Sequence, residues 1–141
     1  MSRTIAIVPA RAGSRGIPNK CSRELAGHPL VNWTLVAALQ ACDLVVLTSN
    51  DPEVLALGWC HERLRVHPRS VMLATARTPD LPVVMDAYRQ IDQAPDDVII
   101  LLRPTAPFRR AGEIRQVAEI LQCDRRFDSV RSVVPAQEHP A

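Results

Sequence analysis

Short apolar, β-branched runs alternate along this chain with segments whose apolar residues recur at helical spacing. The runs predict buried strands at residues 4–10, 44–49, 64–67, 97–102 and 129–134. The spacing predicts helices at residues 29–41, from Asp51 to about Cys60, at Val84–Ile91 and at Ile114–Leu121. Strands that alternate with helices in this way indicate an α/β fold, in which a mainly parallel sheet lies between two helical layers.

Two predicted helices carry local start signals. The carboxylate of Asp51 can accept a backbone N–H hydrogen bond as a helix cap, and Pro52 fits the first helical position. Asp80 is expected to start the helix that contains Val84, and the loop before that helix is expected to be long.

Length and composition fit one globular domain over residues 1–141. The 17 basic and 15 acidic residues give a formal charge of only +2, so no strong field points to nucleic acid or to a membrane surface. The chain has neither an apolar run long enough to span a bilayer nor the pattern of a signal peptide. Its four cysteines form no CxxC pair, which favours reduced thiols and a cytoplasmic location.

Parallel sheets bind ligands beyond the carboxyl ends of their strands, and in this chain the corresponding loops begin at Pro9, Thr48, His67 and Arg103. The first loop, residues 9–20, holds two glycines and a serine, and its cations Arg11, Arg15 and Lys20 could neutralise a triphosphate. The spacing fits neither G-x-x-x-x-G-K-[ST] nor G-x-G-x-x-G. We interpret the loop as a phosphate-binding loop; the alternative is a solvated, flexible basic loop.

A second unusual loop, residues 101–109, follows the clearest of the predicted strands. Pro104 and Pro107 favour an extended, rigid backbone there. Loops fixed on a rigid scaffold often carry function, although an ordinary strand-to-helix connection is the alternative for this segment.

Four segments together resemble the acylneuraminate (CMP-sialic acid) cytidylyltransferase family: residues 5–20, 25–30, 33–34 and 101–109. The first is close to the family pattern P-A-R-x-G-S-K-G-x-P-x-K-N, and the last is close to L-L-Q-P-T-S-P-x-R. The resemblance extends from about residue 4 to residue 139, which corresponds to the first part of a family chain. It implies a three-layer, Rossmann-like nucleotidyltransferase fold.

The resemblance also implies a reaction. A hydroxyl of an acidic, acylneuraminate-like sugar would attack the α-phosphate of CTP, giving a CMP-activated sugar and pyrophosphate, with Mg²⁺ as cofactor. Arg11, Arg15 and Lys20 would be the catalytic residues, because they would stabilise the leaving pyrophosphate. Family chains continue into a segment for acceptor recognition, dimer contacts and magnesium-binding aspartates. The metal ligands of this chain are therefore unknown, and a homodimer is left open.

The binding residues follow from the same resemblance. The nucleotide would be bound by Ala10, Arg11, Ala12, Gly13, Ser14, Arg15, Lys20, Cys21, Ser49, Asn50 and Arg103. The substrate would be bound by Arg69, Arg77 and Thr78.

Three positions depart from the family pattern. Cys21 stands where the family has an asparagine that helps to read cytosine, Arg103 where it has a glutamine, and Ala76 where an aspartate is usual. Arg77 and Arg103 make the cleft more cationic, which suits a doubly charged acceptor. Two alternatives to the sugar-activating enzyme therefore stay open: a phosphonate cytidylyltransferase, and a truncated, non-catalytic nucleotide- or partner-binding domain.

Overall fold

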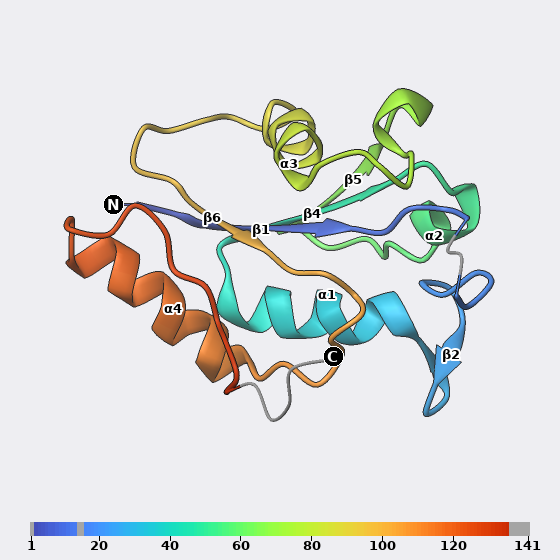
Figure 1. The fold of residues 1–141 in the computed structure, drawn as a ribbon, viewed down its shortest axis with the longest axis horizontal. Helices are drawn as coiled ribbons and strands as arrows, with labels where there is room; N and C mark the ends of the chain where they lie inside the picture. The colour runs from blue at the N-terminus through green and yellow to red at the C-terminus, as the bar shows by residue number, and fades with distance from the viewer. Residues whose placement is uncertain (1, 14–15, 136–141) are drawn as a thin grey trace, which may run out of the picture.

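The computed structural model of the chain describes residues 2–13 and 16–135. Within these residues a four-stranded parallel sheet runs through the middle of the molecule (Figure 1). Its strands, in the order in which they lie side by side, are β5 (Leu64–Pro68), β4 (Leu44–Ser49), β1 (Thr4–Pro9) and β6 (Val98–Leu101). Every pairing is parallel, and Ile7 of β1 lies between Val46 of β4 and Leu101 of β6. The predicted α/β fold with a mainly parallel sheet is confirmed.

Helices cover both faces of this sheet. The helical elements are α1 (Leu30–Ala41), α2 (Pro52–Ala56), a 3₁₀ turn η1 (Val71–Leu73), α3 (Asp80–Tyr88) and α4 (Ala111–Cys123). Figure 1 shows α1 and α4 on one face and α3 on the other. The molecule therefore has three layers.

The central strand β1 explains why its sequence is apolar without alternation. Ala6 and Val8 pack in the cluster on the α1 side, whereas Ile5 and Ile7 pack with Ala87 of α3 on the other side. Successive side chains of a strand point to opposite faces, so a strand covered on both faces needs apolar residues throughout.

The two predicted helix starts are confirmed, whereas the predicted end of α2 was wrong. The Asp51 carboxylate accepts a hydrogen bond from the backbone N–H of Glu53 at 3.0 Å, and α3 begins at Asp80, both as expected. Helix α2, however, ends at Ala56 and not near Cys60. Gly58 follows at a close approach to β5, where a Cβ atom would lie 2.5 Å from Cγ2 of Val66. The end of α2 is therefore determined by the contact between Gly58 and β5. The local sequence pattern does not contain this contact.

A small hairpin that was not predicted lies between the loop after β1 and helix α1, and it includes Pro29, which was expected to begin the helix. Strands β2 (Glu24–Leu25) and β3 (His28–Pro29) pair antiparallel, and Ala26 and Gly27 both adopt positive φ at the turn between them. The indole N–H of Trp33 donates to the carbonyl oxygen of Leu25 at 2.9 Å, so the hairpin is attached to α1.

The last predicted strand, residues 129–134, was wrong, because these residues form no strand in the structure. Val133 and Val134 are 83% and 87% exposed. A β-branched run becomes a strand only where a neighbouring edge completes its backbone hydrogen bonds, and in the described residues no strand pairs with this one. The local sequence cannot show whether the folded protein places the edge of another strand beside these residues.

Two further observations concern membrane-spanning helices and the cysteines. In residues 2–13 and 16–135, no helix is both long and apolar enough to cross a bilayer. The four cysteines are free thiols, of which Cys21 and Cys42 are buried.

Candidate functional site

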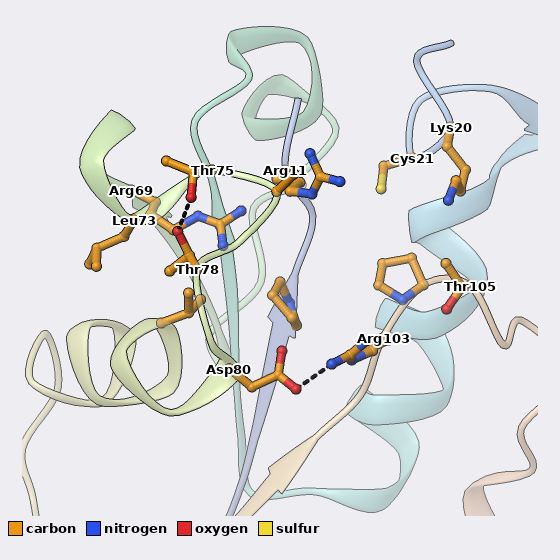
Figure 2. Close-up of a pocket in the computed structure, with 14 residues that line it drawn as sticks. Arg11, Lys20, Cys21, Arg69, Leu73, Thr75, Thr78, Asp80, Arg103 and Thr105 are labelled. Atoms are coloured by element: carbon orange, nitrogen blue, oxygen red, sulfur yellow. Dashed lines mark hydrogen bonds and ion pairs between the residues drawn. The ribbon is translucent and has the colours of Figure 1, made fainter. Parts of the chain in front are cut away.

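A cavity of about 330 Å³ opens beyond the carboxyl ends of the strands (Figure 2). Its walls come from the loops after β1, β5 and β6 and from the start of α3. The lining residues are Pro9, Arg11, Lys20, Cys21, Arg69, Leu73, Thr75, Ala76, Thr78, Asp80, Val83, Arg103, Pro104 and Thr105. Four of these side chains are basic and one is acidic, so the cavity suits an anionic ligand.

Arg69, directly after β5, is the buried cation of this cavity. Its side chain belongs to a residue that is only 7% exposed, and its Nε and Nη2 atoms have no hydrogen-bond partner among the described residues. Burial lowers the pKa of Arg69, and the nearby Arg11 guanidinium lowers it further. Because arginine stays protonated in proteins, Arg69 is a buried positive charge, and its Nε–H and Nη2–H donors are not used by the described residues. Nε and Nη2 lie on one edge of the guanidinium, and such an edge binds two oxygens of one carboxylate or phosphate.

The loop after β1 is attached to the end of β4. The backbone N–H of Ala12 donates to Oδ1 of Asn50 at 3.0 Å, and the hydroxyl of Ser49 donates to the carbonyl oxygen of Ala10. Ala10 and Ser49 are buried and, like Ala12 and Asn50, do not line the cavity. Gly13 adopts φ +69°, a conformation that favours glycine. These residues, which were predicted to bind the nucleotide, thus stabilise the conformation of the loop without lining the cavity.

Three lining residues come from this loop and its continuation. Arg11 donates from Nη1 to the carbonyl oxygen of Gly13 at 3.2 Å, which holds its side chain within the loop. Lys20 and Cys21 line the other side of the cavity in Figure 2. Burial raises the pKa of the Cys21 thiol, so this group is neutral and contributes no charge to a ligand.

Arg103 and Asp80 face each other across the cavity and form an ion pair (Figure 2). The backbone of Arg103 is fixed, because its carbonyl oxygen accepts from Nη1 of Arg109 at 2.9 Å. At the rim, the hydroxyls of Thr75 and Thr78 share a hydrogen bond of 2.7 Å.

The structure brings together part of the predicted site. Of the predicted residues, those that line the cavity are Arg11, Lys20, Cys21, Arg69, Thr78 and Arg103. Arg77 is exposed and does not line it. Ser14 and Arg15 lie outside the described residues. Asp80, Thr75 and Thr105 line the cavity without having been predicted to, and Asp80 carried only a helix-start signal in the sequence.

The described residues do not offer a ligand set for a metal ion. In residues 2–13 and 16–135, no three side chains of His, Cys, Asp or Glu converge. The one carboxylate of the cavity, on Asp80, is already paired with Arg103. A divalent cation would therefore find few protein oxygens in this part of the chain.

Comparison with known proteins gives a consistent result. A family model described as cytidylyltransferase matches residues 5–139. The CMP-N,N'-diacetyllegionaminic acid synthase of Legionella pneumophila is 36% identical over 144 aligned residues, which cover 99% of this chain and 61% of that protein. The N-acylneuraminate cytidylyltransferase A of Danio rerio is 31% identical over 133 residues, which cover 92% of this chain and 30% of that protein. The chain thus spans 61% of the length of the first relative and 30% of the length of the second.

Solved structures share the fold at lower identity. A CMP:2-keto-3-deoxy-manno-octonic acid synthetase complexed with CTP superposes with a TM-score of 0.70 at 18% identity, over 88% of this chain and 49% of the other. Rv0371c of Mycobacterium tuberculosis H37Rv, in a complex with manganese, superposes with a TM-score of 0.63 at 16% identity, over 86% and 60%.

Proposed function

Because the chain belongs to the cytidylyltransferase family, we propose that it binds CTP and transfers the cytidylyl group to a hydroxyl of an acidic sugar, with release of pyrophosphate. The observation that supports this most directly is the buried guanidinium of Arg69, whose Nε and Nη2 atoms have no hydrogen-bond partner among the described residues, in a cavity with three further cations. A triphosphate and an acidic acceptor together bring several negative charges, which such a cavity can neutralise.

The acceptor class is inferred from the relatives. The synthase of Legionella pneumophila is named for a legionaminic acid and the protein of Danio rerio for an N-acylneuraminate, and both names denote sugar acids. Arg69 and Thr78 would contact the acceptor, as the sequence predicts. The exposed position of Arg77 does not support a contact in this structure.

The chemistry needs position and charge more than a covalent intermediate. The acceptor oxygen attacks the α-phosphorus, the bond from that phosphorus to the bridging oxygen breaks, and the hydroxyl proton leaves to solvent. Arg11 and Lys20 would stabilise the charge that develops on the leaving pyrophosphate. Arg15 is proposed for the same role from its place in the sequence.

Magnesium stays a proposal that rests on the family resemblance and on the manganese complex of one structural neighbour. When bound, a divalent cation neutralises triphosphate charge. The described residues do not form a site for it, so charge neutralisation is assigned to the basic side chains of the cavity. A homodimer and a cytoplasmic location are likewise predictions from the sequence.

Thermal unfolding with CTP, UTP, ATP or GTP, each with and without Mg²⁺, tests the nucleotide site. CTP at about 100 times its Kd should add about 2.7 kcal/mol, a rise of several degrees in Tm. Arg11→Ala should abolish this rise, and Arg23→Ala is the matched control, because Arg23 is exposed and does not line the cavity. No rise with any nucleotide contradicts the proposal.

Pyrophosphate release then separates the candidate activities. Release with CTP and N-acetylneuraminate supports the sugar-activating enzyme, and release only with a phosphonate supports the phosphonate cytidylyltransferase. A rise in Tm with CTP but no release with any acidic acceptor supports the non-catalytic nucleotide-binding domain.

A further inference from the structure

The charges of the cavity are held in two different ways. Arg69, at the inner wall, is buried and its Nε–Nη2 edge has no partner among the described residues. Arg103, toward the solvent, is paired with Asp80, and the two side chains are 57% and 47% exposed. An anion at Arg69 therefore meets a cation that has no carboxylate partner among the described residues, whereas an anion that binds Arg103 must compete with the carboxylate of Asp80.

The ion pair joins two walls of the cavity. Asp80 is the first residue of α3, and Arg103 follows β6 at the carboxyl end of the sheet. Figure 2 shows the two side chains pointing toward each other, with Arg11 and Arg69 in the opposite part of the cavity. Among the described lining residues Asp80 is the one acid, so it supplies the only negative charge that this wall presents to a ligand.

We propose that Asp80 is a specificity-determining residue, which limits the charge of the acceptor by holding Arg103 and repelling a second anionic group at that end of the cavity. The proposal deepens the proposed function and rests on it, since an acidic acceptor must share this cavity with CTP. It favours acceptors with a single carboxylate over those that carry a phosphate or phosphonate as well.

Elementary electrostatics sets the size of the effect. A negative charge on a ligand about 5 Å from Asp80, at the dielectric constant of water, loses about fourfold in affinity, and each further charge loses about fourfold again. The ion pair is exposed, so displacing Asp80 from Arg103 costs at most about another fivefold. Salt screens these interactions, so the effect is largest at low ionic strength.

Asp80 also has a structural role that a test must separate. It lies in the first turn of α3, where a negative charge is stabilised by the helix dipole. Glu113 is also an acidic residue in the first turn of a helix, α4, where it accepts a hydrogen bond from the backbone N–H of Arg110, and it does not line the cavity. Glu113→Gln is therefore a matched control for Asp80→Asn: both remove one carboxylate from a helix start, and only one of them changes the cavity.

Titration calorimetry on the full chain, at low ionic strength and with CTP present, tests the proposal with two probes. N-acetylneuraminate carries one carboxylate, and phosphonoacetate carries a carboxylate and a phosphonate. Asp80→Asn should strengthen phosphonoacetate binding at least fourfold more than it strengthens N-acetylneuraminate binding. Arg103→Gln should weaken phosphonoacetate binding, and Glu113→Gln should leave both affinities within about twofold of the original protein.

Equal changes for the two probes in Asp80→Asn, or no change relative to Glu113→Gln, overturn the proposal. If the original protein does not bind CTP, the proposed function fails by that result alone. The same variants are then compared in the absence of nucleotide, with pyrophosphate and acetate as the probes. A gain in Asp80→Asn that is larger for pyrophosphate supports the role of Asp80, and its absence refutes that role.

Discussion

The side-chain oxygen of Asn50 accepts a hydrogen bond from the backbone N–H of Ala12 at 3.0 Å, which connects the end of β4 to the loop that follows β1. Neither residue lines the cavity, yet the contact fixes the backbone next to Arg11. The position of a cavity cation thus depends on an amide that lies 38 residues further along the chain.

Asn50→Ala should weaken CTP binding about fivefold, because the loop loses a hydrogen bond worth about 1 kcal/mol and Arg11 loses its fixed backbone. The CTP-dependent rise in Tm measures this. Asn32→Ala is the control, because Oδ1 of Asn32 has no partner among the described residues and the residue is outside the cavity. An unchanged Kd for Asn50→Ala would show that the loop is held by other contacts.

Arg69→Met should stabilise the ligand-free protein and abolish its further stabilisation by the acidic acceptor, which Arg69 is proposed to contact. The substitution removes a buried, unpartnered charge and keeps the apolar stem, for which a gain of about 1 kcal/mol or more is expected. Urea unfolding of the ligand-free protein, and of the protein with CTP in the presence and absence of N-acetylneuraminate, measures both effects on one variant. A loss of stability without ligand would mean that the guanidinium has a structural partner in the native protein.

Two glycine substitutions should change stability in opposite directions. Gly58→Ala places a Cβ atom 2.5 Å from Val66 Cγ2 and should cost about 1–3 kcal/mol. Gly112→Ala, in α4, meets no atom within 4 Å and should gain up to about 1 kcal/mol through helix propensity. Urea unfolding measures both. Equal effects would contradict the close approach of the segment after α2 to β5.

Asp97 should make stability depend on pH in the acid range. The Arg3 guanidinium, with hydrogen bonds of 3.0 and 2.7 Å, holds the pKa of Asp97 at about 2. The unfolded pKa is about 4, so the stabilisation is complete above pH 4 and is lost as pH falls toward 2.

Asp97→Asn should remove this pH dependence and cost about 1–3 kcal/mol at pH 7, because it weakens the bonds to Arg3 and to Tyr88. Chemical unfolding at a series of pH values measures the slope. Asp96→Asn is the control: Asp96 lies 3.7 Å from the exposed Arg125, and such pairs contribute little. If the free energy of unfolding of Asp97→Asn still falls between pH 4 and pH 2, other carboxylates cause the pH dependence.

Much of the fold could be predicted from local patterns. Residues 5–9 and 44–47 are apolar without alternation because helices cover both faces of the sheet, and this pattern can be recognised in the sequence alone. Asp51 and Asp80 start helices by local chemistry. The failures at residues 129–134 and at the end of α2 share a cause, since each depends on what a distant segment places beside the chain.

The candidate site divides in the same way. Arg11, Lys20 and Arg103 follow strand ends, and topology alone directs them to one edge of the sheet. The burial of Arg69 and the pairing of Asp80 with Arg103 could not be predicted, because they arise from the packing of η1 and α3 against the loops. The exposed Arg77 shows the limit of assigning roles by motif: its neighbour Thr78 lines the cavity and Arg77 does not.

The Nε–Nη2 edge of Arg69, which has no hydrogen-bond partner among the described residues, has a consequence for the lifetime of the protein. A chain that carries this buried charge unfolds more readily when no oxyanion is bound, and unfolded chains are the ones that proteases degrade. Bound substrate would slow that degradation. The abundance of the protein should therefore rise and fall with the supply of its acidic acceptor, so that the half-life of the protein itself reports whether that substrate is available.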